Sequence, residues 1–135
     1  MGPNEAGLDK GFIASEAMNQ FSVVKLTDVE ECAVQADDDA NWLGVVQEEV
    51  LTGDNGIGRR VVNVRMVGIT RAVVATAGTL DIGDFVVATT DGELVAVPST
   101  AGDYFTVGWL MTKPEDDGDH VDLMLTPGRT VTVSG

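Results

Sequence analysis

The sequence predicts an all-β protein, folded as a compact β-barrel or β-sandwich of short antiparallel strands with an internal pseudo-repeat and an extended N-terminal arm. Hydrophobic residues make up 44% of the 135 residues and aromatics only 5%, so the core must consist mainly of Val, Leu, Ile, Ala and Met. Val prevails, and a side chain branched at Cβ fits a pleated sheet better than a helix. Short apolar runs alternate with turn residues, and no segment keeps a helical apolar period.

Three regions are expected along the chain. Residues 1–14 hold several glycines and few large apolar side chains, which predicts a flexible arm. Residues 15–127 predict a single β domain that begins with one helical turn at 15–20, and residues 128–135 predict a β-prone tail. The strands of the domain are expected at 21–26, 31–35, 43–46, 61–67, 70–74, 85–89, 94–97, 105–111 and 121–125.

The connections between these strands are rich in turn residues. Asn55-Gly56 and Asp91-Gly92 are dipeptides that supply the positive φ angles of tight hairpins. Many short strands at this spacing favour a sandwich or a small barrel.

Two segments of the domain resemble each other, at about 21–67 and 85–125. Each begins with a Phe, continues through a strand centred on a Gly and an acidic loop, and ends in an alternating strand. Phe21 and Phe85 lie as far apart as Gly44 and Gly108. The pattern predicts a duplicated unit, seen as two similar sheets or half-barrels packed face to face.

The charge of the chain excludes several kinds of partner. Acidic residues number 22 against 8 basic ones, for a net charge of -14. Nucleic-acid binding requires Lys and Arg to displace counterions from phosphates, so neither nucleic acid nor an anionic membrane is expected as a partner. Such a surface favours solubility at high concentration.

The compartment is expected to be reducing. Cys32 is the one cysteine, so no internal disulfide can form, and a small buried residue is the expected role. The first fifteen residues lack the pattern of a signal peptide, and no apolar stretch has the length of a membrane span. We therefore expect a soluble protein that folds in a reducing compartment.

No catalytic, cofactor or metal site is predicted. His120 is the only histidine and lies in an acidic hairpin tip, so a Ser/His/Asp triad would depend on it, and no serine lies in a nucleophile elbow. The loop 53–58 is rich in Gly but lacks the Lys-Ser/Thr of a phosphate cradle.

One segment imitates a calcium loop. Asp37, Asp39 and Asn41 are spaced as in such a loop, and Glu48 stands at its twelfth position. The sixth position is Trp42, where the loop needs Gly, and no helices flank the segment. We do not expect calcium binding there.

Four aromatic residues are the expected anchors of the core or of an interface. Trp42 and Trp109 lie next to the two repeated glycines, and Phe21 and Phe85 begin the two copies. Large aromatic side chains dominate both cores and protein contacts, so both roles remain open.

The two ends of the chain are candidate contact segments. Leu8, Phe12 and Ile13 lie on the glycine-rich arm, which suits a segment that becomes ordered against a partner. Val131 and Val133 alternate with Thr in the tail, which suits a strand added to a neighbour. The alternative is that both ends are simply frayed.

Several phrases resemble one family. Asn41-Trp-Leu-Gly-Val-Val, Ala77-Gly-Thr-Leu-Asp-Ile-Gly-Asp-Phe-Val, Asp91-Gly-Glu-Leu and Tyr104-Phe-Thr-Val-Gly-Trp-Leu are similar to the small β-rich head decoration, or cement, proteins of tailed bacteriophages. The resemblance runs from about residue 17 to 127. It implies a β-tulip-like fold and a homotrimer without catalytic residues.

The resemblance also implies a place and a partner. Such proteins are synthesised in the host cytoplasm, bind the outer capsid surface of the virion and clamp neighbouring copies of the major capsid protein. Two rival functions remain. A carbohydrate- or receptor-binding β module of a phage fibre or tail would expose a cluster of aromatics, and a small trimeric β-barrel enzyme would need phosphate-binding motifs.

Overall fold

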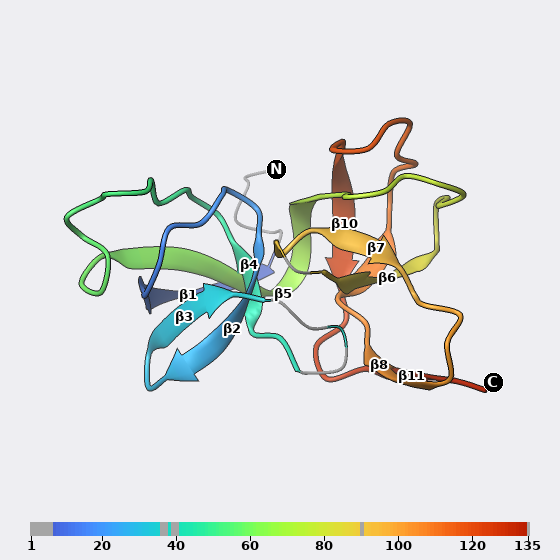
Figure 1. The fold of residues 1–135 in the computed structure, drawn as a ribbon, viewed down its shortest axis with the longest axis horizontal. Helices are drawn as coiled ribbons and strands as arrows, with labels where there is room; N and C mark the ends of the chain where they lie inside the picture. The colour runs from blue at the N-terminus through green and yellow to red at the C-terminus, as the bar shows by residue number, and fades with distance from the viewer. Residues whose placement is uncertain (1–6, 36–37, 39–40, 90, 135) are drawn as a thin grey trace.

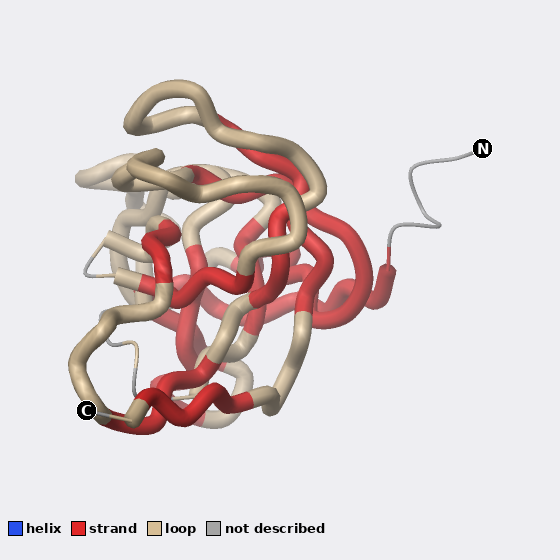
Figure 2. The backbone as a smooth tube through the Cα atoms, turned by 90° about the vertical axis from the view of Figure 1, so that its right-hand side faces the viewer, coloured by secondary structure: helices blue, strands red, loops and turns tan. Residues whose placement is uncertain are grey.

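The computed structural model describes residues 7–35, 38, 41–89 and 91–134. The described residues are all-β, as the sequence predicts, and none of them forms a helix, least of all one long and apolar enough to cross a membrane (Figure 2). The strands are β1 (Gly7–Ala14), β2 (Val23–Asp28), β3 (Glu31–Val34), β4 (Gly44–Val46), β5 (Val61–Val73), β6 (Phe85–Ala88), β7 (Leu94–Ala96), β8 (Gly102–Phe105), β9 (Gly108–Leu110), β10 (His120–Leu125) and β11 (Thr130–Val133).

The first five strands form a ring. Strand β5 pairs antiparallel with β1 on one side and β4 on the other, β4 pairs with β2, β2 with β3, and β3 returns to β1 in parallel. The left half of Figure 1 shows this ring. The long strand β5 then passes through Gly68, at a φ of 103°, into the right half of the molecule.

The second half repeats this arrangement. The end of β5 pairs with β10, β10 with β9, β9 with β6 and β6 with β7. A parallel bridge from Val74 to Leu94 returns the chain to β5, as the β1–β3 pairing does in the first half. The strand order is therefore symmetric about the β5–β10 pairing. The two ring-like halves, which were expected as two similar sheets or half-barrels, are joined through the shared strand β5.

Equivalent main-chain hydrogen bonds support the duplication. The N–H of Gly58 donates to the carbonyl of Ala14, and the N–H of Gly118 donates to that of Val74, both at 2.7 Å. In the first half Ala14 pairs with Cys32 of β3, and in the second half Val74 pairs with Leu94 of β7, both in parallel. Each half therefore closes its ring with the same bond, at positions 60 residues apart.

The predicted register of the repeat needs one correction. The N–H groups of Phe21 and Gly83 make the same 2.8 Å bond, to the last residue of β4 and of β9 respectively. Phe21 therefore corresponds to Gly83 and not to Phe85. Both have positive φ, 67° and 89°. Glu30, at 60°, corresponds in the same way to Gly92, at 71°.

Two hydrophobic cores result, one for each ring. The core of the first ring consists of Phe12, Ala14, Met18, Val24, Cys32, Val46, Val50, Val62 and Val64. The larger core of the second ring consists of Val23, Trp42, Val45, Ala72, Val74, Leu80, Val86, Ala88, Leu94, Val107, Leu110, Val121, Leu123 and Leu125.

The described part of the expected arm is a strand. Gly7–Ala14 is β1, and it is hydrogen-bonded along the first half of β5. Alternation turns Phe12 and Ala14 inward, where they are 6% and 0% exposed. Burial of a Phe side chain contributes about 2–3 kcal/mol, which offsets the entropy of ordering a glycine-rich segment.

Three smaller predictions also differ from the structure. The helical turn at 15–20 does not form, because Met18 exchanges main-chain hydrogen bonds with Val50. The strands expected at 61–67 and 70–74 are the single strand β5. The strand expected at 105–111 is divided into β8 and β9, because Thr106 bonds to Arg129 while Val107 bonds to Val86.

Candidate interaction surfaces

A row of apolar side chains crosses the outer face of the second half. Phe85 of β6 lies opposite Trp109 of β9, Trp109 opposite Met124 of β10, and Met124 opposite Ile69 of β5. All four are half-buried. The guanidinium carbon of Arg129 lies 4.4 Å from the centre of the Phe85 ring. We call Phe85, Trp109, Met124 and Ile69 the aromatic row.

The side chains of the same strands that face the other way fill the second core. Val86 of β6, Leu110 of β9 and Leu123 of β10 are all fully buried. Because side chains alternate along a strand, the aromatic row must lie outside the ring. Contiguous apolar side chains that stay partly exposed are typical of a protein contact.

The equivalent face of the first half is covered. Val23 of β2 lies opposite Val45 of β4, in the positions that Phe85 and Trp109 occupy in the second half. Both Val side chains are 0% exposed, and both belong to the core of the second ring. The first half thus uses this face to pack against the second half, whereas the equivalent and larger side chains of the second half, Phe85 and Trp109, are only half-buried.

Trp42 links the first half of the molecule to the second. Its side chain is 6% exposed, and its indole N–H donates a 2.9 Å hydrogen bond to the carbonyl of Thr106 in the second half. Of the two expected roles, it therefore takes that of a core anchor. Trp109 lies at the surface in the aromatic row, and Phe21 is half-buried with its ring edge-on to His120 at 5.8 Å.

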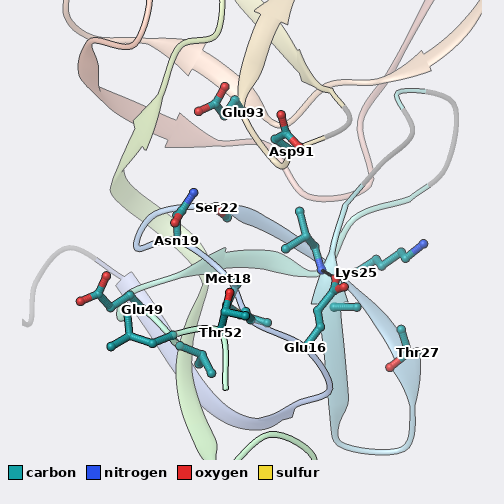
Figure 3. Close-up of a pocket in the computed structure, with 15 residues that line it drawn as sticks. Glu16, Met18, Asn19, Ser22, Lys25, Thr27, Glu49, Thr52, Asp91 and Glu93 are labelled. Atoms are coloured by element: carbon teal, nitrogen blue, oxygen red, sulfur yellow. Dashed lines mark hydrogen bonds between the residues drawn. The ribbon is translucent and has the colours of Figure 1, made fainter. Parts of the chain in front are cut away.

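A groove of about 820 Å³ lies between the first half and the turn from β6 to β7 (Figure 3). Its charged lining consists of Glu16, Glu49, Asp91 and Glu93 with the single cation Lys25. Asp91 and Glu93 stand on the opposite wall from the other labelled side chains (Figure 3). The groove has an acidic lining that disfavours anionic ligands, and its described lining contains no His, Cys, Arg or Tyr.

An ion pair on the outer face of the first half ties β1 to β5. Arg65 Nε donates to Asp9 Oδ1 at 2.7 Å, Arg65 Nη2 donates to Oδ2 at 3.0 Å, and Asn63 Nδ2 donates to Oδ2 at 2.8 Å. These bonds, chiefly those from Arg65, hold the pKa of Asp9 below its ordinary value. Their geometry suits a structural clasp.

The residues considered for chemistry are not assembled into a site. Among the described residues, no group of three or more His, Cys, Asp or Glu side chains is placed to hold a metal ion. The Cys32 thiol is buried, which raises its pKa to about 11, so the reactive thiolate is scarce at neutral pH. His120 is exposed at the start of β10.

The sequence contains a glycine-rich loop at 53–58 and a segment that imitates a calcium loop. In the loop 53–58 the amide of Gly56 already donates to the carboxylate of Asp54 at 2.6 Å, which lowers the pKa of that carboxyl, and Arg60 Nη1 donates to it at 2.9 Å. The calcium-like segment includes Asp37 and Asp39, which lie outside the described residues.

The predicted contact residues separate into two groups. Phe12 is buried in the first core, so it is not available as a surface contact, while Ile13 is half-buried and Leu8 is 61% exposed. Val131 and Val133 are half-buried in β11, which pairs with β8 of the same chain. The tail therefore forms a strand, as its sequence suggested, but this strand pairs with β8 of the same chain instead of a neighbour.

Comparison with known proteins identifies the fold. No family model matches the sequence, and no curated protein matches it. The structure is similar to that of the N base of the head fibre gp8.5 of bacteriophage phi29, with a TM-score of 0.63 and 17% sequence identity. The match covers 88% of this chain and 93% of that one. The chain therefore shares the fold of a head-fibre base over nearly the whole length of both.

Proposed function

We propose that the chain is a structural virion protein of a tailed bacteriophage, which binds the outside of the assembled capsid as a homotrimer and cements neighbouring copies of the major capsid protein. It has no catalytic role in this proposal. The observation that carries the proposal is the fold shared with the phi29 head-fibre base, because the match spans almost all of both chains. The resemblance of its sequence phrases to decoration proteins points to the same part of the virion.

The aromatic row supports the oligomeric part of the proposal. Within one chain, the face that carries Val23 and Val45 is covered by the next copy of the repeated unit. The second copy carries Phe85 and Trp109 in those positions, where the described residues leave both side chains half-buried. A neighbouring chain supplies that cover in a head-to-tail contact, and such a contact forms a closed ring when the rotation between chains fits. The expectation of three chains in the ring comes from the resemblance to trimeric decoration proteins.

The acidic surface suits this function. A net charge of -14 keeps many copies of a protein soluble before they reach the shell. It also disfavours binding to the packaged nucleic acid, so the partner is expected to be protein.

The experiment is co-sedimentation with heads. Heads purified from the encoding phage after deletion of this gene are mixed with the purified protein, in expanded and unexpanded forms. We expect saturable binding to expanded heads and improved resistance of those heads to heat. Absence of binding to either form contradicts the proposed function.

The trimer is tested separately. Trp109→Glu and Met124→Lys place a charge in the aromatic row and are expected to abolish the trimer in sedimentation equilibrium. Val29→Glu is the matched control, because Val29 is 84% exposed at the tip of the β2–β3 hairpin. Thermal unfolding shows whether each variant is folded. Trimers that persist in both row variants contradict this use of the row.

A fibre component is the second candidate function. The phi29 protein is the base of a head fibre, which favours a chain that stands on the capsid and presents a fibre or binding module. Binding to host cells or to glycans by the purified protein distinguishes this function from cementing.

A further inference from the structure

The two-stranded sheet of β8 and β11 has an open edge. Phe105 lies opposite Thr130, and the N–H of Phe105 donates to Asp38 on the far side of β8, at 3.0 Å. In an antiparallel pair, such outward-facing residues alternate with hydrogen-bonded ones. Thr130 and Thr132 therefore direct their main-chain N–H and C=O groups away from β8. Within the described part of the chain, no hydrogen bond uses these groups.

Three other strands with open edges, β1, β2 and β5, carry features that disfavour strand addition. Strand β1 has Asp9 and Lys10 beside a bulge, and β2 has Lys25 and Asp28 beside another. On β5, Arg65 Nη1 donates a 3.1 Å hydrogen bond to the main-chain carbonyl of Ile69. Charges, bulges and covered carbonyls are the usual means by which proteins block pairing at an edge.

Strand β11 carries none of these features. Its sequence, Thr-Val-Thr-Val, contains no charge, proline or bulge, and every residue is branched at Cβ. This is unexpected in a chain with a net charge of -14. An unprotected edge of high β propensity is a template for another strand.

The same four residues are complementary to themselves. In an antiparallel pairing centred on Val131, Thr130 of one copy lies opposite Thr132 of the other, and the two exchange main-chain hydrogen bonds. Val131 then lies opposite Val131 of the second copy on the face that also carries Tyr104. Matched Thr and Val pairs of this kind stabilise a sheet, and no like charges meet across the contact.

We propose that β11 pairs edge to edge with β11 of a second copy of this chain, which joins the two β8–β11 ribbons into one four-stranded sheet. The contact has two-fold symmetry, so it differs from the head-to-tail contact proposed for the trimer and links chains of different trimers. It stands whether or not the capsid function is correct, because it depends on β11 alone.

A disulfide reports this pairing directly. Val131 would face its own counterpart at a non-hydrogen-bonded position, where Cα atoms are about 4.5 Å apart, within the range of a disulfide. We expect Val131→Cys to form covalent dimers in a glutathione redox buffer. Val29→Cys is the control, because it places a more exposed cysteine at a hairpin tip that is not expected to pair, so its dimers measure chance oxidation. Cys32 is buried and does not interfere.

A second variant removes the hydrogen bond instead of trapping it. Thr132→Pro deletes an N–H on the open edge and leaves the bonds of Val131 and Val133 to β8. We expect it to lose the association between trimers that sedimentation equilibrium should detect for the wild type. Thermal unfolding should change little, because the one other bond lost is the exposed side-chain hydrogen bond from Thr132 to Asp103. The proposal is wrong if Val131→Cys forms no more dimer than Val29→Cys, or if Thr132→Pro associates like the wild type.

Discussion

The two repeated glycines provide a sharp test of the duplicated unit. A methyl group at Gly108 would overlap the carbonyl oxygen of Met124, lie 2.9 Å from its carbonyl carbon and lie 3.0 Å from the Leu123 side chain. A methyl group at Gly44 would overlap the carbonyl oxygen of Arg65 and lie 2.7 Å from Val64. In both halves, a glycine thus permits the short strand to approach the long strand beside it.

Replacing either glycine by Ala forces those strands apart. Overpacking of this kind costs about 1–3 kcal/mol, and each ladder hydrogen bond that is lost adds about 1 kcal/mol. We expect Gly108→Ala and Gly44→Ala each to lower the free energy of unfolding by about 2–4 kcal/mol. That is a large share of the roughly 5–15 kcal/mol that stabilises a typical domain.

Urea unfolding at 25 °C, followed by Trp fluorescence, measures the effect. Gly118→Ala is the control, because Gly118 has a φ of 88° and open space around its Cα, so its substitution costs only the backbone strain of about 1–2 kcal/mol. The reasoning is refuted if Gly108→Ala is no less stable than the control, or if only one of the two repeated glycines is sensitive.

Three further predictions follow from single contacts. Asp9→Asn should lower the free energy of unfolding by about 1–2 kcal/mol at pH 7, since it weakens charged hydrogen bonds to Arg65. Folding lowers the pKa of Asp9, so this stability is present above the ordinary value of 3.8 and is lost as the pH falls through the folded pKa. Wild type and variant should therefore have converging stabilities in urea titrations at low pH. Cys32 should resist thiol reagents at pH 8 until urea unfolds the chain, and rapid labelling of the native protein would contradict its burial. Glu30→Gly should stabilise the protein by about 0.5–1 kcal/mol in thermal unfolding, because Glu30 holds the positive φ that Gly92 holds in the other half; a loss of stability would speak against the equivalence.

The positions of most strands could be predicted from the sequence, but which strands pair with one another could not. The alternation in residues 61–67 and 121–125 predicts strands because side chains alternate between core and surface, and these strands are present. Strand β1 was missed because Gly7 and Gly11 lower its local β propensity, and its stability comes from pairing with β5. No local signal reports such a distant partner.

The candidate surfaces also depend on strand pairings that the local sequence does not reveal. Phe85 and Trp109 stand out in the sequence as anchors, but their row depends on the register of four strands. The covering of Val23 and Val45 depends on how the two halves pack. The equivalence of Gly44 and Gly108 was readable, because a glycine required by close approach of two strands recurs in each copy. The offset of Phe21 was misread, since its true counterpart is a glycine.

The central claim is that this chain is part of the phage head. Electron cryomicroscopy of virions from the encoding phage, with and without this gene, tests it most directly. We expect three-fold density on the outer capsid surface that fits the two-ring fold and disappears in the deletion mutant. Identical heads in the two preparations would contradict it.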